Sequence, residues 1–145
     1  MNVKTIMAAK KLGGEIISTE PTATLAAAAQ LLSAHRIGAV VILGAGGRLA
    51  GILSERDIVR AISAQGAAAL ESLVGQAMTR NVTTCSEDDN IAAIMVRMTA
   101  GKFRHMPVVA DELPIGLISI GDVVKQRLDE IERESEAMRD YIRTA

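Results

Sequence analysis

The sequence predicts an α+β fold: two copies of a strand–helix–strand–strand–helix unit packed with pseudo-twofold symmetry, followed by a long C-terminal helix. Residues 51–57 (Gly-Ile-Leu-Ser-Glu-Arg-Asp) and 116–122 (Gly-Leu-Ile-Ser-Ile-Gly-Asp) share a glycine, two aliphatic residues, a serine and an aspartate three residues later. Each copy of this motif ends an apolar run and opens a helical one, so the two are expected at equivalent strand-to-helix junctions.

The duplication extends well beyond the motif. Phe103 lies 66 residues after Ile37 in a matching apolar run, and the same offset relates 16–19 to 82–85. After residue 43 the offset falls to 65, so one turn is a residue shorter in the second copy. Repeats of this size are supersecondary units that bury their apolar faces against a neighbour.

The repeat gives a division of the chain. The leading segments 3–7 and 74–78 also resemble each other, and the first copy has a longer connector at residues 8–15. We therefore expect a first repeat with its leading segment, a second repeat and a C-terminal helical extension, at residues 1–66, 67–124 and 125–145.

The elements follow from hydrophobic patterning. In the first copy Leu25, Ala28 and Leu32 form one helical stripe, and 38–43 is a continuous aliphatic run typical of a strand covered on both faces. The first copy is thus expected to have strands at 16–18, 38–43 and 49–53 and helices at 24–34 and 57–64. The second copy repeats this order, and Glu87, Asp88 and Asp89 stand where carboxylates favour a helix N-terminus.

A hairpin turn explains the glycine-rich stretch 44–47 without any ligand. This region also has two other interpretations, a dinucleotide-binding loop and a membrane helix. It resembles the start of a dinucleotide-binding loop, but Leu49 stands at the third glycine position and a strand-like run follows. Residues 37–53 carry a single charge and could suggest a membrane helix. The matching stretch of the second copy holds Arg104, His105 and two acidic residues, which argues against a membrane span in either copy.

The C-terminal helix carries a heptad pattern. Apolar or small residues recur at alternating steps of four and three: Val124, Leu128, Ile131, Ser135, Met138 and Ile142. Such a helix could lie on its own domain, but an extension of this length needs a partner surface. The pattern favours a subunit interface, and hence a homodimer.

Composition excludes several function classes. The chain of 145 residues is 49% hydrophobic with one Phe, one Tyr and no Trp, so its core is aliphatic. The net charge of −1 gives no electrostatic reason to bind nucleic acid. The single cysteine, Cys85, excludes an internal disulfide and a cysteine-based metal cluster, and we expect no metal. The N-terminus lacks the pattern of a signal peptide, which favours a cytoplasmic protein.

The Ser-x-x-Asp motif by itself is typical of a helix capping box. Its context favours a ligand site as well, because a glycine before each serine permits close approach of another group. The second copy also places Lys102, Arg104 and His105 just before a strand, where they could grip a phosphate, although solvated surface charge is the commoner explanation.

These residues resemble tandem CBS domains, the regulatory pair called a Bateman module. The match covers nearly the whole chain except the C-terminal helix and is carried by residues 51–59, 103–109 and 116–122. The resemblance implies a regulatory, energy-sensing module and not an enzyme, with no catalytic cofactor. Its expected ligand is an adenosyl compound such as AMP, ADP, ATP, a dinucleotide of the NAD type or S-adenosylmethionine.

The resemblance also implies two composite sites between the repeats. The first is expected to contain Ser54, Arg56, Asp57, Thr83, Lys102, Phe103, Arg104, His105 and Pro107. The second is expected to contain Ile17, Ser18, Gly38, Ala39, Val41, Ser119 and Asp122. In each, the carboxylate would accept the hydroxyls of a ribose while aliphatic residues enclose adenine.

The two sites are not expected to be equal. Gly121 stands where the first site has Arg56, and Gly38 and Ala39 stand where it has Arg104 and His105. We therefore expect the first site to hold a phosphorylated ligand more tightly, and the second to take a less charged group, the far half of a dinucleotide, or nothing. With no effector domain in this sequence, the regulated protein is expected to act in trans.

Two other classes of function remain as alternatives. One is an enzyme, for which His35, His105 and Cys85 supply reactive groups, but no nucleophile–base spacing joins them. The other is a structural oligomer held by the heptad pattern, with empty clefts.

Overall fold

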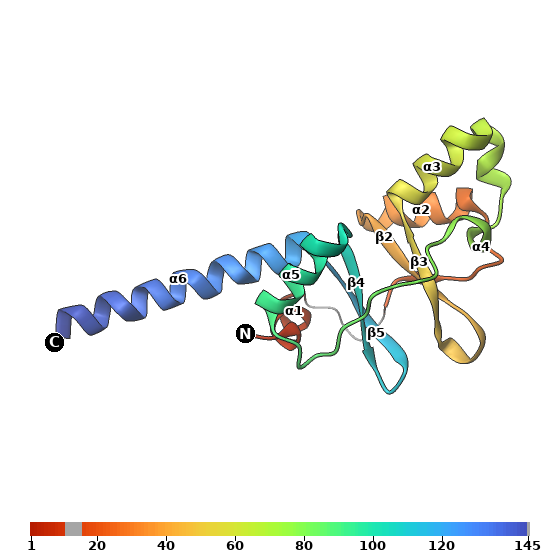
Figure 1. The fold of residues 1–145 in the computed structure, drawn as a ribbon. Coiled ribbons are helices and arrows are strands. Elements are labelled where there is room, and N and C mark those ends of the chain that lie inside the picture. Colours follow the sequence, from red (N-terminus) through yellow and green to blue (C-terminus); the bar gives the residue numbers. More distant parts are fainter. Residues whose placement is uncertain (11–15, 145) are drawn as a thin grey trace.

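The computed structural model describes residues 1–10 and 16–144. Figure 1 shows two α/β halves side by side, with one long helix projecting from the second half. The part of the expected connector at residues 11–15 lies outside the described residues. The predicted α+β fold with two repeats and a long C-terminal helix is confirmed.

The elements follow the predicted order, except that the described residues of the second half form no regular strand before its first helix. The first half contains β1 (Ser18–Thr19), α2 (Leu25–His35), β2 (Ala39–Leu43), η1 (Ala45–Gly47), β3 (Leu49–Ser54), α3 (Glu55–Gln65) and η2 (Gly66–Glu71). The second contains α5 (Ile91–Gly101), β4 (His105–Ala110), β5 (Leu113–Ser119) and α6 (Ile120–Thr144). Two short helices lead into the repeats, α1 (Val3–Ala9) and α4 (Val74–Ala77).

The first sheet has the strand order β1-β2-β3. β1 pairs with β2 in parallel, and β2 pairs with β3 as an antiparallel hairpin in which Val41 faces Ile52. Gly46 and Gly47 turn this hairpin with φ angles of 70° and 73°, a conformation that glycine adopts without a Cβ clash. The hairpin interpretation of the glycine-rich stretch is thereby confirmed.

The second sheet is smaller than expected. β4 and β5 form an antiparallel pair in which His105 faces Ser119. The strand expected in the second copy to match residues 16–18, at residues 82–84, is replaced by one parallel bridge between Cys85 and Val108. Cys85 still makes two backbone hydrogen bonds, to Pro107 and Val109, so this segment keeps the place beside β4 that β1 has beside β2.

The two cores exchange their leading helices. Val3 and Ile6 of α1 are fully buried in the core of the second half, whose members include Ile91, Met106 and Ile118. Conversely, Val74 and Met78, from the segment that precedes the second copy, pack in the core of the first half. Each half is therefore completed by a segment that comes before the other repeat, which locks the two halves together.

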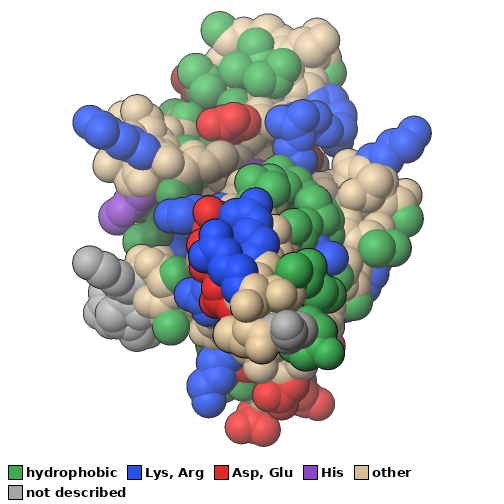
Figure 2. Space-filling view, turned by 90° about the vertical axis from the view of Figure 1, so that its left-hand side faces the viewer, with side chains coloured by type: hydrophobic (Ala, Val, Ile, Leu, Met, Phe, Trp, Pro, Cys, Tyr) green, Lys and Arg blue, Asp and Glu red, His purple; other side chains and the backbone are tan. Residues whose placement is uncertain are grey.

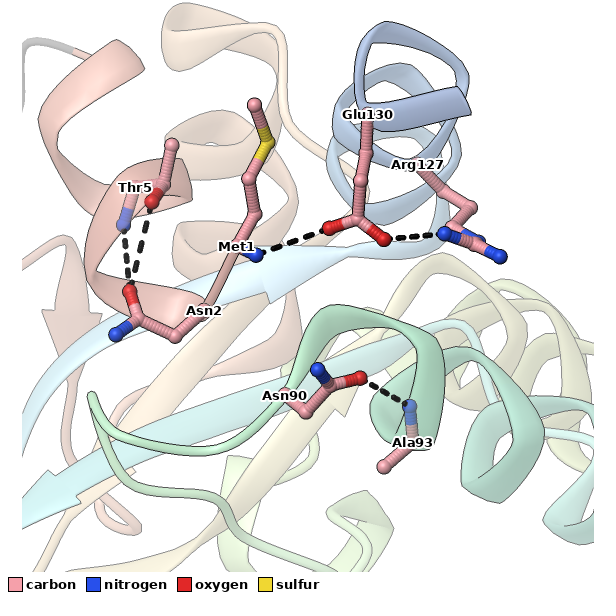
Figure 3. Close-up of polar contacts among 7 residues, drawn as sticks. All are labelled: Met1, Asn2, Thr5, Asn90, Ala93, Arg127 and Glu130. Carbon is pink, nitrogen blue, oxygen red and sulfur yellow. Dashed lines mark hydrogen bonds and ion pairs between the residues drawn. The ribbon is translucent and has the colours of Figure 1, made fainter. Parts of the chain in front are cut away.

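The base of α6 is anchored on the second half, and the rest projects. Val123 and Gln126 are buried, and the Glu130 carboxylate lies 3.0 Å from the Met1 nitrogen while also pairing with Arg127 (Figure 3). Residues 131–144 are all exposed. None of the helices in the described part of the chain is long and apolar enough to cross a membrane.

Candidate functional site: two clefts between the repeats

The first cleft opens where β3 passes into α3, opposite the start of β4. Its volume is about 300 Å³. One wall comes from the Ser54–Asp57 motif and the other from the loop and strand that begin the second sheet. The lining residues are Gly38, Ile52, Ser54, Glu55, Arg56, Asp57, Arg60, Thr79, Asn81, Val82, Thr83, Lys102, Phe103, Arg104 and His105.

Asp57 lies deep in this cleft and is only 5% exposed. Its Oδ2 accepts hydrogen bonds from the Ser54 backbone N–H at 2.9 Å and from the Ser54 hydroxyl at 3.1 Å, which completes the predicted capping box at the start of α3. Its Oδ1 accepts a hydrogen bond from the Thr79 hydroxyl at 3.2 Å and lies 3.5 Å from Arg60. The carboxylate is therefore fixed in direction by Ser54, Thr79 and Arg60.

The second cleft is related to the first by the pseudo-twofold symmetry and has a volume of about 380 Å³. It lies between the Ser119–Asp122 motif at the start of α6 and the region around β2. Its lining residues are Lys10, Ile16, Ile17, Arg36, Ile37, Gly38, Ala39, His105, Ile115, Gly116, Leu117, Ser119 and Asp122.

Asp122 repeats the cap but has a different second partner. Its Oδ2 accepts a hydrogen bond from the Ser119 backbone N–H at 2.8 Å and forms an ion pair with the Lys10 ammonium at 2.7 Å. Lys10 also donates to the Leu117 carbonyl at 3.0 Å. Burial alone would raise the pKa of Asp122, but the hydrogen bonds from Lys10 and Ser119 outweigh it and hold the pKa below its ordinary value.

His105 borders both clefts, and so does Gly38. A Cβ at Gly38 would stand 3.3 Å from the imidazole ring, so the glycine lets the ring lie close to the β2 backbone. Burial lowers the pKa of His105 and favours the neutral imidazole, with Glu55 and Asp122 opposing this shift and Lys10 and Arg104 reinforcing it. The same side chain therefore forms part of the wall of both clefts.

The structure brings most of the predicted site residues together. In the first cleft all of them line the cavity except Pro107, which is buried within β4 opposite Leu117. In the second cleft Ile17, Gly38, Ala39, Ser119 and Asp122 line the cavity. Ser18 and Val41 do not line it; they are partners in the β1–β2 pairing, and Val41 is fully buried.

The lining residues that the sequence analysis missed include Lys10, Arg36 and Thr79. Arg36 could have been found, since it lies 66 residues before Lys102 and both end a helix in the left-handed conformation, at φ of 54° and 56°. Thr79 carries no motif of its own and acts only because α4 packs against the first half. Lys10 lies in the connector, 112 residues from its partner Asp122, and no local signal relates the two.

The charge difference between the clefts is smaller than expected. Lys10 and Arg36 line the second cleft, where the sequence analysis anticipated few cations. The first still has the larger cationic set, with two acidic residues beside it: Arg56, Arg60, Lys102 and Arg104 against Glu55 and Asp57. Within residues 1–10 and 16–144, no three His, Cys, Asp or Glu side chains are grouped to hold a metal ion.

Comparisons with known proteins agree with this architecture. The family model described as CBS domain matches residues 3–64 and 74–129. The CBS domain-containing protein CBSX3, mitochondrial, of Arabidopsis thaliana is 35% identical over 119 residues, which cover 79% of this chain but only 58% of the Arabidopsis protein.

Two solved structures are similar over most of the chain. The CBS-domain containing protein ATU1752 from Agrobacterium tumefaciens has a TM-score of 0.82 and 43% identity, covering 88% of this chain and 99% of that one. The CBS domain pair of protein MJ0100, in complex with 5′-methylthioadenosine and S-adenosyl-L-methionine, has a TM-score of 0.76 and 26% identity, covering 90% and 98%. Because the family model matches both halves and the fold agrees with these structures, this chain belongs to the CBS domain family as a tandem pair of CBS domains.

Proposed function

We propose that this protein is a regulatory module that binds an adenosyl nucleotide (AMP, ADP, ATP or a dinucleotide of the NAD type) between its two repeats. The observation that carries the proposal is the pair of equivalent clefts, each with a fixed carboxylate at a helix start and residues of the other repeat opposite. The adenosyl ligands of protein MJ0100, whose domain pair has the same fold, support the choice of ligand class.

The chemistry of the first cleft suits such a ligand. The Asp57 carboxylate has four lone-pair sites, and the Ser54 N–H, the Ser54 hydroxyl and the Thr79 hydroxyl occupy three of them. The remaining site can accept a ribose hydroxyl, and either neighbouring hydroxyl can rotate to bind the ligand instead. Lys102 and Arg104 are placed to meet phosphate oxygens by charge-assisted hydrogen bonds.

The second cleft binds more weakly in this proposal. A ribose that approaches Asp122 competes with Lys10, which already holds the carboxylate at 2.7 Å. A ligand with a phosphate could draw Lys10 away from Asp122, but only at the cost of breaking that pair. We therefore keep the expectation that the first cleft has the higher affinity for a phosphorylated ligand.

The proposed signal is a change in the angle between the repeats, or between two protomers of a homodimer, on nucleotide binding. A ligand shifts such an equilibrium only if it binds the two arrangements unequally. His105 and Gly38, which border both clefts, are where occupancy would be felt across the interface. The C-terminal helix α6 begins at the second cleft and would carry the change to a protein partner in trans.

Calorimetric titration of the full chain with AMP, ADP, ATP, NAD and S-adenosylmethionine tests the proposal. Asp57→Ala should weaken binding by roughly ten- to a hundredfold, the loss expected for hydrogen bonds to a charged group. Asp57→Asn, which keeps the size of the side chain, serves as a second variant, and exposed Asp88→Ala, outside both clefts, is the matched control. Full affinity in Asp57→Ala with loss of binding in Asp122→Ala would reverse the order of the sites.

The alternative, a structural module without a ligand, gives a different result in thermal unfolding. A true ligand at a hundred times its Kd adds about 2.7 kcal/mol of stability. If none of the five compounds raises Tm at millimolar concentration, the alternative is supported. The proposal includes no catalysis, so ATP incubated with the protein should remain unchanged.

A further inference from the structure

The projecting helix α6 carries an uncovered apolar seam. We define the α6 seam as Val124, Leu128, Ile131, Ser135, Met138 and Ile142. Four of its members, Leu128, Ile131, Met138 and Ile142, are between 45% and 66% exposed. Figure 2 looks along α6 from its C-terminal end and shows hydrophobic side chains gathered on one side of it, next to charged ones. A single helix of this kind, with its apolar side in water, gains stability by covering that side.

The base of the helix limits what can cover the seam. Val123 and Gln126 are buried against the second half, and Glu130 contacts the Met1 nitrogen. At 3.6 residues per turn, the seam lies about a third of a turn away from this anchored face. The protein's own second half therefore occupies one side of α6 and leaves the seam open to one further helix.

The charges beside the seam identify that helix. We infer that α6 pairs in parallel and in register with α6 of a second copy of this chain. In a parallel two-stranded coiled coil, the residue just before each a position of the heptad faces the residue five positions later on the other helix. The a positions of the α6 seam are Leu128, Ser135 and Ile142. This places Glu134 opposite Arg139 and Arg127 opposite Glu132. Both combinations attract, and each occurs twice in the pair of helices.

Antiparallel pairing fits less well. If all six seam residues are paired in that direction, Ile131 meets Ser135 of the other copy. Like charges then meet beside the seam: Glu132 opposite Glu132, Glu134 opposite Glu134, and Lys125 opposite Arg139. Sliding the helices by one heptad removes these repulsions but leaves only four of the six seam residues paired. The parallel arrangement alone keeps both the whole seam and the attractive charges.

Charge-reversal substitutions in the full chain, with the dimer Kd measured by sedimentation equilibrium, test the parallel pairing. The wild-type protein should form a dimer, and Glu134→Arg and Arg139→Glu should each raise its Kd roughly five- to tenfold by making two like-charge pairs. The double variant restores opposite charges and should return Kd to near the wild-type value. In the slid antiparallel arrangement Arg139 faces Glu132, so the double variant would stay as weak as Arg139→Glu.

The matched control is Arg133→Glu, which makes the same charge change on the side of α6 opposite the seam. It should leave the dimer unchanged. A wild-type protein that stays monomeric at 100 μM or forms larger assemblies, single variants that dimerise normally, or a double variant that is not restored would each overturn the inference.

Cross-linking gives a second readout. Only parallel, in-register helices bring the two copies of residue 135 together, at a separation that a disulfide can span. Ser135→Cys should therefore form a covalent dimer on mild oxidation, whereas Arg133→Cys should not. Cys85 is buried and can remain in place, with the unmodified chain as its control. Failure of Ser135→Cys to cross-link faster than Arg133→Cys would contradict the parallel register.

The inference deepens the homodimer of the proposed function, and its failure can be told apart from failure of ligand binding. Residues 133, 134, 135 and 139 line neither cleft. Nucleotide affinity measured on the same variants therefore reports on the clefts, and sedimentation reports on α6.

Discussion

Two equivalent glycines should respond very differently to the same substitution. Gly51 and Gly116 open the two copies of the repeated motif. A Cβ on Gly51 would lie 2.5 Å from the backbone oxygen of Thr79, whereas on Gly116 it would meet only the side-chain end of Met7, with the sulfur at 2.7 Å. The Thr79 backbone forms a β-bridge with Ile52 and cannot move aside without losing hydrogen bonds. The methionine side chain, in contrast, can rotate about three bonds.

The expected magnitudes follow from these contacts. In Gly51→Ala, Thr79 must move by about an ångström, which strains or breaks its two hydrogen bonds with Ile52, at 2.9 and 3.0 Å. Overpacking costs about 1–3 kcal/mol and each lost hydrogen bond about 1 kcal/mol, so we expect a loss of about 3 kcal/mol, or roughly 10 °C in Tm. Gly116→Ala should lose about 1 kcal/mol or less, because Met7 repacks.

Urea denaturation of both variants beside the wild type measures the difference directly. Gly51→Ala should also weaken ligand binding in the first cleft, because the displaced Thr79 no longer donates to Asp57. Equal losses of stability in the two variants, or a larger loss in Gly116→Ala, would refute the reasoning from close approach.

Two further predictions concern titratable groups. The pKa of His105 is lowered in the folded protein, mainly by burial, so the unfolded chain binds more protons as pH falls through the ordinary histidine value of 6.5. The urea concentration at the unfolding midpoint should therefore fall as the pH is lowered from 7.5 to 5.5, and His105→Gln should make this fall smaller. An unchanged pH dependence in that variant would show that His105 is not its source. Burial, aided by the charge of Asp89, raises the pKa of Cys85 to about 12. The native thiol should thus resist a disulfide reagent at pH 8 and react fully in urea; rapid labelling of native protein would contradict its burial.

Much of the fold follows from local signals in the sequence. The Ser-x-x-Asp capping boxes at Asp57 and Asp122 form because serine and aspartate three residues apart satisfy the first N–H groups of a helix, whatever else they contact. The hairpin at residues 44–47 follows from glycine's access to positive φ. The duplication extended the predicted elements from one copy to the other. The cleft residues followed from the resemblance to CBS domains, and most of them line the cavities.

What could not be predicted depends on contacts between distant segments. The pairing of Lys10 with Asp122 and of Thr79 with Asp57 arises because α1 and α4 cross to the opposite halves, which no local pattern records. Pro107, Ser18 and Val41 were assigned to the clefts by the resemblance to CBS domains, but they line neither cavity. Residues two apart on a strand share a face, so Val41 and Pro107 lie on the same face as Ala39 and His105 but further along the strand, where they are buried beyond the reach of the clefts. Ser18 lies beside Val41 in the first sheet.

The exchange of α1 and α4 between the halves bears on how the chain is made. During synthesis, α1 leaves the ribosome before either repeat, but the surface that receives Val3 and Ile6 includes Ile118 and does not exist until both repeats have been translated. The helix α1 is thus synthesised before both repeats but docks only after the second, and its apolar side chains stay exposed to water in the meantime. A fragment beginning after the first repeat should accordingly be a poor folder, and adding a peptide of residues 1–10 should rescue it.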